Sequence, residues 1–377
     1  MSLRICHIVP SLEDRHGGPS KSVRALANHL VQPDLSVDLL STLEEGHPGA
    51  PGNDHAALID FPRVSPRWLS RSPKMSEHLS TTDYDIVHNH ALWLLPLRYA
   101  HAAAKRSGAP LVISPRGMLS GWAYAHRRWR KRIAEHLVHP KALSGAAGWH
   151  ATSAEEAEDI RRLGYRQPIC IAPNGVPIPD STEREQQRTA WLQICPALSG
   201  RRVALFYSRF HRKKRLRELF DLWVSAPRGE WLLLIVGVPE DYQATEISQW
   251  IAAAGAQESV VAFDGADRPS PYGAAELFLL PSHSENFGLV IAEALAAGLP
   301  PLVTSTTPWR SLNDHAAGWC VAWDDYSATL ANALSLSPER LSEMGVAGRQ
   351  LAARDYSWSG AARRLHDFYR QLLHVRS

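Results

Sequence analysis

The sequence lacks several features that would assign it to a simple class. Its 377 residues include only four cysteines, and Cys6, Cys170, Cys195 and Cys320 form no C-x-x-C pair. This spacing excludes the usual zinc site and disulfide framework, and it fits a reducing compartment. No apolar run approaches the roughly 20 residues needed to cross a bilayer, and residues 1–5 lead straight into a strand pattern without a secretory signal. We therefore expect a cytoplasmic protein.

The sequence also lacks a strong net charge. It carries 41 Lys and Arg against 38 Asp and Glu, and the excess of positive charge falls in residues 1–176. No recognised nucleic-acid-binding module accompanies this basic half, so we expect no nucleic-acid partner. A chain of this length exceeds one ordinary hydrophobic core, which predicts two domains.

Short apolar segments alternate with helical stretches along the whole chain, which predicts an α/β fold with doubly wound parallel sheets. The predicted strands are 37–40, 58–61, 86–88, 111–114, 149–152, 203–208, 231–236, 260–263, 277–280, 302–304 and 319–321. Functional residues in such sheets gather at the carboxyl ends of the strands.

Two Rossmann-like domains account for this alternation. We place the first at 1–176 and the second at 177–356, and we expect the polar segment 180–200 to be a connector. The last segment, 357–377, has the pattern of an amphipathic helix and is expected to pack back on the first domain.

A pair of glycines, Gly17-Gly18, follows the first predicted strand and precedes a helix. The G-x-G-x-x-G fingerprint of dinucleotide-binding proteins is absent from this loop. A glycine pair lets the backbone approach a phosphate or a sugar closely, although it is more often an ordinary turn.

Two further motifs surround the strand at 86–88. The triplet Asp83-Tyr84-Asp85 has the shape of a metal–diphosphate clamp, but it precedes the strand, so we interpret it as a loop cap. His88 and His90 have the alternation that places two side chains on one strand face. Because the sequence shows no third ligand, we expect no metal site. Arg116, in the turn S-P-R-G, is another candidate at a carboxyl end.

The segment 125–141 combines an apolar stripe with a dense basic face, formed by Arg127, Arg128, Arg130, Lys131 and Arg132. A basic amphipathic helix with an interfacial tryptophan suits an anionic membrane surface, which would make the protein peripheral at the inner face of the plasma membrane. A helix packed on the sheet with a solvated basic face explains the pattern equally well.

The loop after 203–208 is strongly basic and includes Arg209, Arg212, Lys213, Lys214 and Arg215. Cations at the carboxyl end of a strand are placed to bind a diphosphate through charge-assisted hydrogen bonds. The alternative is a solvated run of charge.

The stretch 281–300, P-S-H-S-E-N-F-G-L-V-I-A-E-A-L-A-A-G-L-P, follows a short apolar strand. Its apolar spacing predicts a helix that begins at Gly288 and stops at Gly298. The first backbone N–H groups of such a helix form a phosphate site. Glu285 and Glu293 bracket this site, either as ligands for sugar hydroxyls or as a helix-terminal acid and a surface acid.

Taken together, these motifs resemble those of the family 4 retaining glycosyltransferases, which have the GT-B fold. The resemblance covers nearly the whole chain and rests on the Gly-Gly loop, D-I-V-H-N-H, S-P-R-G-M-L, H-A-T-S, P-N-G-V, the R-x4-K loop, E-x7-E and T-T-P-W. Within the family, S-P-R-G-M-L and T-T-P-W look most like bacterial enzymes of lipopolysaccharide, capsule or exopolysaccharide assembly.

The resemblance implies a role for each matching residue. Arg209 and Lys214 would grip the donor diphosphate, Glu285 would lie against the donor sugar, and Glu293 would bind the ribose hydroxyls. The backbone of Phe287, Gly288 and Leu289 would hold the distal phosphate, with Gly18 across the cleft from it. His90 (with His88 as the fallback) and Arg116 would lie near a sugar. The loops that hold Val238, Asp264 and Gly265 would contact the base.

The family pattern is altered at two positions, because Ser208 and Arg215 stand where glycines are usual.

The resemblance implies a retaining hexosyltransferase without a metal or another cofactor, with a GDP- or UDP-sugar donor and a saccharide or lipid-linked acceptor. The reaction would occur in the cleft between the domains. A non-catalytic sugar-nucleotide-binding scaffold with the same fold is the alternative.

Overall fold

The computed structural model describes residues 3–13, 18–44, 55–120, 138–139 and 141–375. These residues form two compact units. The first comprises the chain up to Gly175 together with residues from Trp358 onward, and the second runs from Val176 to Ser357. The domain boundary expected near Val176 lies beside this division. Among the described residues, no helix combines the length and the apolar character needed to cross a membrane.

A seven-stranded parallel sheet forms the centre of the first unit, in the order β3-β2-β1-β4-β5-β6-β7. Its strands are β1 (Leu3–Ile8), β2 (Leu35–Leu43), β3 (Ala57–Pro62), β4 (Ile86–His90), β5 (Leu111–Ser114), β6 (Gly148–Ala151) and β7 (Ile169–Ile171). The central strands are buried along their whole length, as expected of a parallel sheet covered on both faces.

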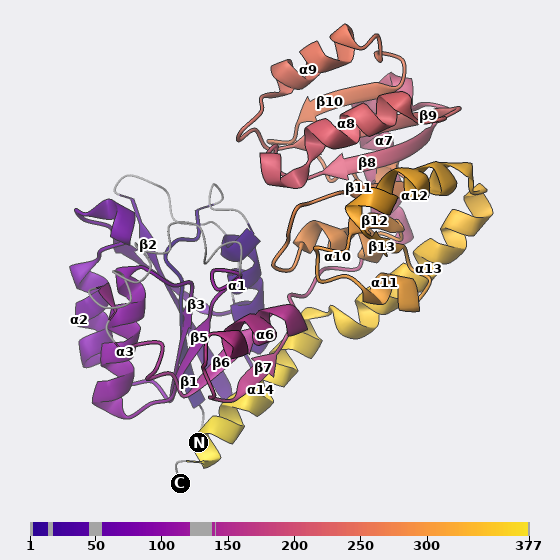
Figure 1. Ribbon diagram of the computed structural model, residues 1–377. Coiled ribbons are helices and arrows are strands. Elements are labelled where there is room, and N and C mark those ends of the chain that lie inside the picture. The colour runs from indigo at the N-terminus through magenta and orange to yellow at the C-terminus, as the bar shows by residue number, and fades with distance from the viewer. Residues whose placement is uncertain (1–2, 14–17, 45–54, 121–137, 140, 376–377) are drawn as a thin grey trace. The chain divides into compact units, whose positions relative to one another are not determined.

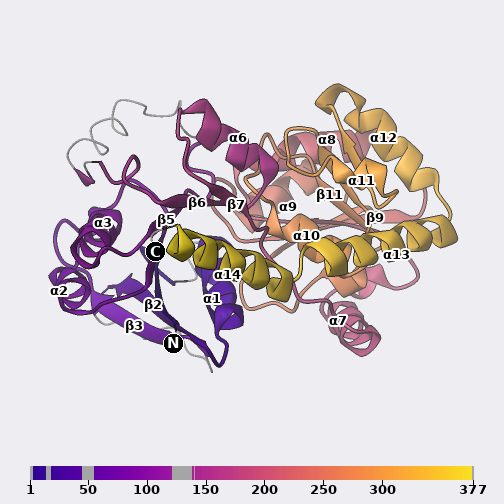
Figure 2. The same cartoon turned by 90° about the horizontal axis from the view of Figure 1, so that it is seen from below.

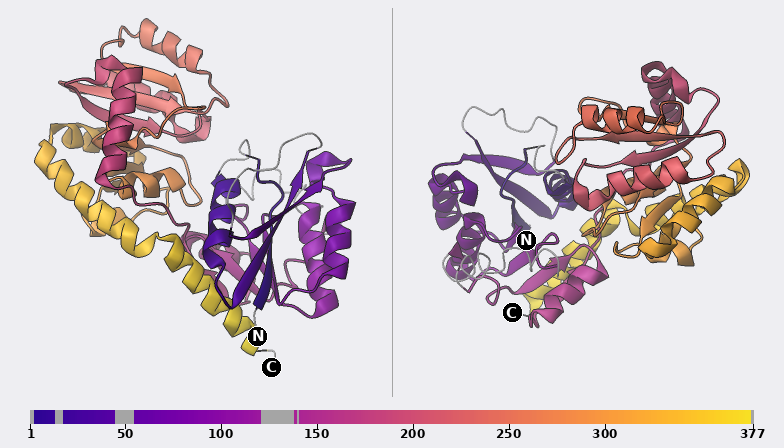
Figure 3. Two further views of the ribbon diagram at one scale, coloured as in Figure 1. Left: turned by 180° about the vertical axis from the view of Figure 1, so that it is seen from behind. Right: turned by 45° about the horizontal axis from the view of Figure 1, so that its top comes forward.

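Helices cover both faces of this sheet, with α2 and α3 on one side and α1 and α14 on the other (Figures 1 and 3). In the described part of the unit, the helices are α1 (Gly18–Leu30), η2 (Arg67–Leu69), α2 (Pro73–Thr81), α3 (Leu95–Ser107), α6 (Ala154–Arg162) and α14 (Trp358–His374). The terminal helix α14 packs against α1, because its apolar side, which includes Leu365, Phe368 and Tyr369, is buried in the same cluster.

The second unit contains a six-stranded parallel sheet in the order β10-β9-β8-β11-β12-β13. Its strands are β8 (Arg202–Tyr207), β9 (Trp231–Gly237), β10 (Val260–Asp264), β11 (Leu277–Leu280), β12 (Pro301–Thr304) and β13 (Trp319–Val321). Strands β9 and β11 are entirely buried, which explains why their sequences are nearly continuous apolar runs.

The helices of the second unit alternate with its strands. They are α7 (Ser181–Ile194), η4 (Pro196–Leu198), η5 (Arg212–Lys214), α8 (Leu216–Ser225), α9 (Ala244–Ala253), η6 (Tyr272–Ala274), α10 (Leu289–Ala296), α11 (Ser311–Asp314), α12 (Trp323–Ser335) and α13 (Pro338–Asp355). After α13 the chain returns to the first unit as α14 (Figure 2).

The prediction of a connector at 180–200 is wrong, because this segment forms the helix α7. Asp180 caps the helix by accepting a hydrogen bond from the backbone N–H of Glu183 at 2.8 Å. The helix buries one residue, Trp191, whose indole N–H donates to the carbonyl of Pro269 at 3.2 Å. The residues from Ser181 to Thr189 are all polar, and the apolar residues of the helix gather at its end, around Trp191. No apolar period therefore runs along the segment, and its sequence is typical of a loop.

The interpretation of Asp83-Tyr84-Asp85 as loop residues is confirmed. Asp85 accepts a hydrogen bond from the backbone N–H of Arg4 at 2.7 Å, and Asp83 pairs with Arg106 at 2.8 Å. Both carboxylates lie before β4, at the amino end of the sheet, and both already have partners within the fold.

Candidate functional site

The basic loop of the second unit leaves the carboxyl end of β8 and is fixed by the neighbouring strand. The backbone N–H of Phe210 donates to the carbonyl of Val238 at 2.8 Å, and the Phe210 side chain is fully buried. The loop then forms the short helix η5, and Arg215 turns the chain into α8 with a left-handed φ of 51°. The cationic side chains of η5 are therefore held at the edge where ligands bind in parallel sheets.

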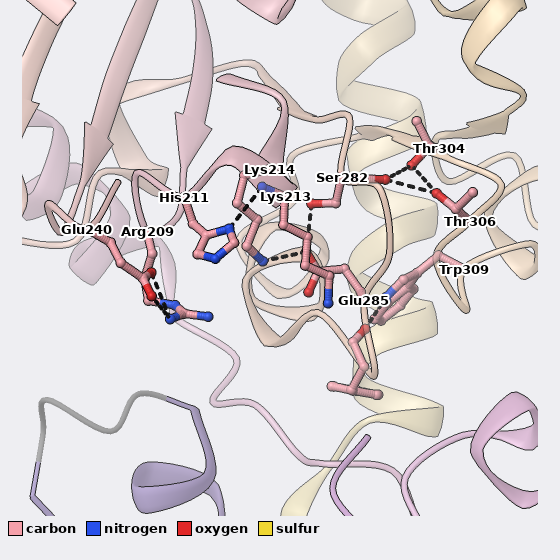
Figure 4. Close-up of polar contacts among 11 residues, drawn as sticks. Arg209, His211, Lys213, Lys214, Glu240, Ser282, Glu285, Thr304, Thr306 and Trp309 are labelled. Carbon is pink, nitrogen blue, oxygen red and sulfur yellow. Dashed lines mark hydrogen bonds and ion pairs between the residues drawn. The ribbon is translucent and has the colours of Figure 1, made fainter. Parts of the chain in front are cut away.

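Lys214 and Glu285 form a buried ion pair at this edge (Figure 4). The Lys214 Nζ lies 2.5 Å from Glu285 Oε1, and each side chain is 10% exposed. The same carboxylate oxygen accepts a hydrogen bond from the Ser282 hydroxyl at 2.6 Å. The structure thus brings together two of the predicted site residues, which come from different βα loops.

Burial would raise the pKa of the Glu285 carboxyl, but the charge and hydrogen bond of Lys214 and the Ser282 hydroxyl lower it below its usual value. Glu285 is therefore an anion at neutral pH. Burial also lowers the pKa of the neighbouring Lys213 ammonium, and Lys214 and Arg209 add to this effect while Glu285 opposes it. The loop concentrates positive charge beside one carboxylate.

Gly288 separates this pair from the helix α10. Its φ of 77° and ψ of 63° lie in the left-handed region, where a residue without a Cβ is strongly preferred. The first turn of α10 carries no acidic residue, and its N-cap has no side chain to satisfy the backbone N–H groups. The start of α10, with Leu289 as its first residue, is thus arranged to receive an anion.

A network around Ser282 and Phe287 holds the turn that precedes α10. The hydroxyls of Thr304 and Thr306 donate to the carbonyl of Ser282 at 2.5 and 2.9 Å, and the indole N–H of Trp309 donates to the carbonyl of Phe287 at 2.5 Å (Figure 4). These three residues belong to the segment around T-T-P-W, for which the sequence indicated a family resemblance but no structural role.

Glu293 lies within α10 and faces a pair of tyrosines. The Tyr272 hydroxyl donates to Glu293 Oε2 at 2.7 Å, and the Tyr272 and Tyr207 rings meet edge to face with centroids 5.4 Å apart. Burial raises the pKa of the Tyr207 hydroxyl, and the Glu293 carboxylate raises it further. Glu293 is therefore a positioned carboxylate and not a solvated surface acid.

Arg209 occupies a different position in the same loop. Its guanidinium makes two hydrogen bonds of 2.9 and 2.8 Å to the carboxylate of Glu240, and its side chain is 55% exposed. Figure 4 shows this pair apart from the Lys214–Glu285 pair. An exposed pair of this kind contributes little to stability, so Arg209 can exchange the carboxylate for another anion at small cost.

Three residues expected near a nucleotide base lie at the ends of β9 and β10. Val238 is 51% exposed, so its apolar side chain lies outside the core of the second unit. Asp264 ends β10, and the backbone N–H of Gly265 donates to the carbonyl of Gly237 at 2.8 Å. The two loops are therefore fixed against each other, with Val238 accessible at their surface.

The first unit holds a second polar cluster at the carboxyl side of its sheet. His88 and His90 come from β4, His7 from β1 and His150 from β6, and all four rings are at most 1% exposed. Arg116, with a left-handed φ of 52°, donates to His90 Nδ1 at 3.1 Å. Both ring nitrogens of His90 have partners, because Nε2 lies 3.0 Å from His7 Nδ1.

The expectation that His88 and His90 lack a third partner is wrong. His7 joins them, and one nitrogen from each ring lies within 4.8 Å of the others. The sequence could not reveal this, because His7 lies on another strand and becomes a neighbour only through the parallel pairing of β1 with β4, where His7 faces His88. A fixed cation, Arg116, stands beside His90, which makes the cluster unfavourable for a metal ion.

Other predictions fall at or beyond the limits of the described residues. Gly18 begins α1, whereas Gly17 lies outside the described range. Most of the basic segment 125–141 also lies outside it, so membrane association through this segment stays a prediction.

Replacing Gly288 with alanine tests the anion site directly. The new Cβ would lie 2.8 Å from Ile291 Cδ1 and 3.3 Å from Glu285 Cγ. We expect a loss of about 1–2 kcal/mol in unfolding free energy, since a left-handed residue with a Cβ is strained, and weaker binding of diphosphate. Gly255, with a φ of 63° and open space around it, provides the matched control. Gly255→Ala should lose similar stability in urea titrations but bind diphosphate normally; equal binding by both variants would contradict the assignment.

Sequence families match most of the chain in two parts. Residues 17–175 match the family described as "Glycosyl transferase 4-like domain", and residues 187–351 match "Glycosyl transferases group 1". The chain is 25% identical to GDP-mannose:cellobiosyl-diphosphopolyprenol alpha-mannosyltransferase of Komagataeibacter xylinus, with 99% of this chain and 94% of that protein covered. It is 26% identical to D-inositol 3-phosphate glycosyltransferase of Thermobispora bispora, over 77% of this chain and 71% of the relative.

Solved structures share the architecture. HepE of Anabaena, crystallised with UDP and glucose, superposes with a TM-score of 0.75 at 18% identity, covering 98% of this chain and all of HepE. The sucrose-phosphate synthase of Thermosynechococcus elongatus gives 0.75 at 20% identity, covering 99% of this chain and all of that one. At these identities the likeness concerns the fold.

Proposed function

Because this chain belongs to the family 4 glycosyltransferases and has the GT-B fold, we propose that it transfers a hexose from a nucleotide sugar to a saccharide or lipid-linked saccharide, with retention of anomeric configuration. The observation that carries the proposal is the placement of Lys214, Glu285 and the start of α10 together, at the carboxyl ends of the strands of the second sheet. Cations and helix N–H groups at this edge suit the diphosphate, and the carboxylate beside them suits sugar hydroxyls.

The leaving nucleoside diphosphate gains negative charge as its bond to the anomeric carbon breaks. The ammonium of Lys214, the guanidinium of Arg209 and the first N–H groups of α10 would stabilise this charge, and fixed donors of this kind are effective because they need no reorganisation. These groups supply positive charge that a bound metal would otherwise provide, so we propose that transfer persists in EDTA.

Retention requires the acceptor oxygen to attack from the face that the diphosphate leaves. The new bond joins the acceptor oxygen to the anomeric carbon, the bond from that carbon to the phosphate oxygen breaks, and the acceptor proton passes to the departing phosphate oxygen. Glu285 would orient the donor sugar through its hydroxyls, and Glu293, held by Tyr272, would accept from the ribose hydroxyls. Arg116 would lie near one of the sugars at the carboxyl edge of the first sheet.

The relatives support a choice of substrates. The mannosyltransferase of Komagataeibacter xylinus is named for GDP-mannose and a cellobiosyl-diphosphopolyprenol acceptor and aligns over nearly the whole chain, which supports a GDP-hexose donor and a lipid-linked acceptor. The pathway that we propose is surface-polysaccharide assembly, on the basis of the S-P-R-G-M-L and T-T-P-W motifs. HepE was solved with UDP and glucose, so UDP-sugars form the second group of donors to assay.

The decisive experiment incubates the purified protein with GDP-mannose or UDP-glucose and a diphosphopolyprenol-linked disaccharide. We expect nucleoside diphosphate and the extended saccharide in equal amounts with one donor, and an unchanged anomeric configuration in the product by NMR. Release of nucleoside diphosphate without an extended saccharide, or an inverted product, would refute the proposal as stated.

Substitutions of Arg209 and of its partner Glu240 should change the affinity for nucleoside diphosphate in opposite directions. Arg209→Ala should weaken binding of the nucleoside diphosphate by about tenfold, because one charge-assisted contact is lost. Glu240→Gln replaces the carboxylate that is paired with the Arg209 guanidinium by a neutral amide, and it should strengthen binding of the nucleoside diphosphate severalfold. Calorimetric titration measures both. Weaker binding by Glu240→Gln would show that this pair holds Arg209 in place for the ligand instead of competing with it.

A further inference from the structure

The polar cluster of the first unit also includes the hydroxyls of Tyr369 and Ser114, which link its histidine rings by hydrogen bonds. Tyr369 of α14 lies between two of the rings, with its hydroxyl 3.1 Å from His7 Nε2 and 2.6 Å from His88 Nδ1. His88 Nε2 lies 2.7 Å from the Ser114 hydroxyl, which lies 2.7 Å from His150 Nδ1. His150 Nε2 then lies 2.9 Å from the carbonyl of Ala172. The groups form one unbranched series.

The direction of every hydrogen bond in this series follows from its first member. Arg116 has only N–H groups, so it donates and His90 Nδ1 accepts. A neutral imidazole has one donor and one acceptor, hence His90 Nε2 donates to His7 Nδ1. His7 Nε2 in turn donates to the Tyr369 oxygen, which leaves the phenol proton for His88 Nδ1.

The last member leads independently to the same directions. A backbone carbonyl can only accept, so His150 Nε2 donates to Ala172 and His150 Nδ1 accepts. Ser114 therefore gives its single proton to His150 and accepts from His88 Nε2. His88 Nδ1 must then accept from Tyr369. The directions derived from Arg116 and from the Ala172 carbonyl therefore agree, and each of the four rings carries its proton on Nε2.

The surroundings keep these rings uncharged. Burial, with Arg116 as a further cause, lowers the pKa of His7 and of His150 to about 3. Burial also places the pKa values of His88 and His90 well below the usual value, and the neighbouring rings and Arg116 add to the effect. A metal ion on His7, His88 and His90 would have to displace hydrogen bonds that these rings already make.

We propose that this series is a positioning device, in which Tyr369 from the far end of the chain joins the half directed by Arg116 to the half directed by Ala172 and so holds His90, and with it the Arg116 guanidinium, in one orientation. Arg116 also donates to the Asn174 side chain at 2.8 Å, so its position is determined from two sides. The functional part of this inference rests on the proposed role of Arg116 beside a sugar substrate. Tyr369 is not itself a catalytic residue, because it is completely buried.

The substitution Tyr369→Phe keeps the ring and removes the link between His7 and His88. Tyr326→Phe is the matched control, because Tyr326 is equally buried on a helix of the second unit and donates one hydrogen bond, to the carbonyl of Leu302 at 3.0 Å. Ser114→Ala breaks the series at another point and serves as a second test if Tyr369→Phe does not fold.

NMR of protein with ¹⁵N-labelled histidine reports the tautomers without any need for activity. We expect four buried, neutral Nε2–H rings that are unchanged between about pH 5.5 and 8 and unaffected by Zn²⁺. Tyr369→Phe should shift the ring ¹⁵N resonances of His7 and His88, which lose their shared partner, and Ser114→Ala those of His88 and His150. Tyr326→Phe should shift none of these resonances. An Nδ1–H tautomer or an imidazolium among the four in the wild type, a Zn²⁺-induced shift of all three clustered rings, or unchanged spectra in both variants would overturn the proposal.

Kinetics tests the consequence for the reaction separately. Tyr369→Phe should reduce kcat about tenfold, because a displaced positioning group slows the reaction, while the affinity for nucleoside diphosphate in the second unit stays unchanged. Shifted resonances of His7 and His88 with unchanged kcat would overturn the positioning role. If no sugar transfer is found in the wild type, the proposed function fails, and the spectra still decide the hydrogen-bond series.

Discussion

Lys214→Met is expected to reduce the rate of sugar transfer by about 100- to 1,000-fold, the usual effect of removing one donor that stabilises a developing anion. Lys214 is the one basic residue of its loop whose side chain is both nearly buried and paired with a site carboxylate among the described residues, and its Nζ lies 2.5 Å from Glu285. The reaction would lose the cation that is paired with Glu285 in the turn before α10. Steady-state kinetics with the identified donor measures the effect.

Lys105→Met controls for the loss of a lysine charge, because Lys105 is exposed in the last turn of α3. We expect wild-type kinetics from it. The Lys214 variant should show its loss mainly in kcat, since the charge to be stabilised develops during bond cleavage. Wild-type kcat in Lys214→Met, in a folded protein, would remove Lys214 from the proposed mechanism.

Glu285→Ala is expected to lower the unfolding free energy by about 3–5 kcal/mol, because it leaves the Lys214 charge buried without its partner. Both side chains are only 10% exposed, so water cannot replace the lost carboxylate easily. The double variant Lys214→Met/Glu285→Leu removes both charges and should recover most of this stability while remaining inactive. Chemical denaturation of Lys214→Met, Glu285→Leu and the double variant provides the complete cycle.

The pH dependence of stability offers a check on the same pair. The pKa of Glu285 is lower in the folded protein than its ordinary value, so its contribution is present above the ordinary pKa and is lost as the pH falls through the folded value. The wild type should therefore lose stability on acidification by more than the double variant does. Parallel curves for the two proteins in acid would contradict the lowered pKa. Equal stability of the wild type and Glu285→Ala at neutral pH would show that the pair is solvated.

The elements that the sequence predicted well are those with one dominant local signal. Buried parallel strands such as β9 and β11 are almost wholly apolar, so their positions follow from composition alone. The stretch 281–300 combines a strand end, a glycine with a left-handed φ and an apolar helix within a few residues. The proximity of Lys214 to Glu285 could be predicted because both follow strands that are neighbours in the sheet.

The features that escaped prediction depend on contacts between distant segments. The hydrogen bond from Tyr369 to His88 spans 281 positions, and that between Tyr369 and His7 spans 362. Tyr369 has the pattern of an ordinary core residue in an amphipathic helix, and nothing in its neighbourhood marks its hydroxyl as functional. Similarly, the pairing of Arg209 with Glu240 depends on how the loops after β8 and β9 meet, which apolar periodicity does not determine.

The return of the chain to the first unit has a consequence for the order in which the protein is made. Residues 176–357 form one contiguous segment, whereas the first unit needs α14, which follows them in the sequence. During synthesis, the second unit can therefore complete its fold while the first still lacks a helix over α1 and the tyrosine between His7 and His88. The nascent first unit would expose the apolar surface that α14 covers. Its two pairs of histidines, His7 with His90 and His88 with His150, would be joined only after Tyr369 of that helix has left the ribosome.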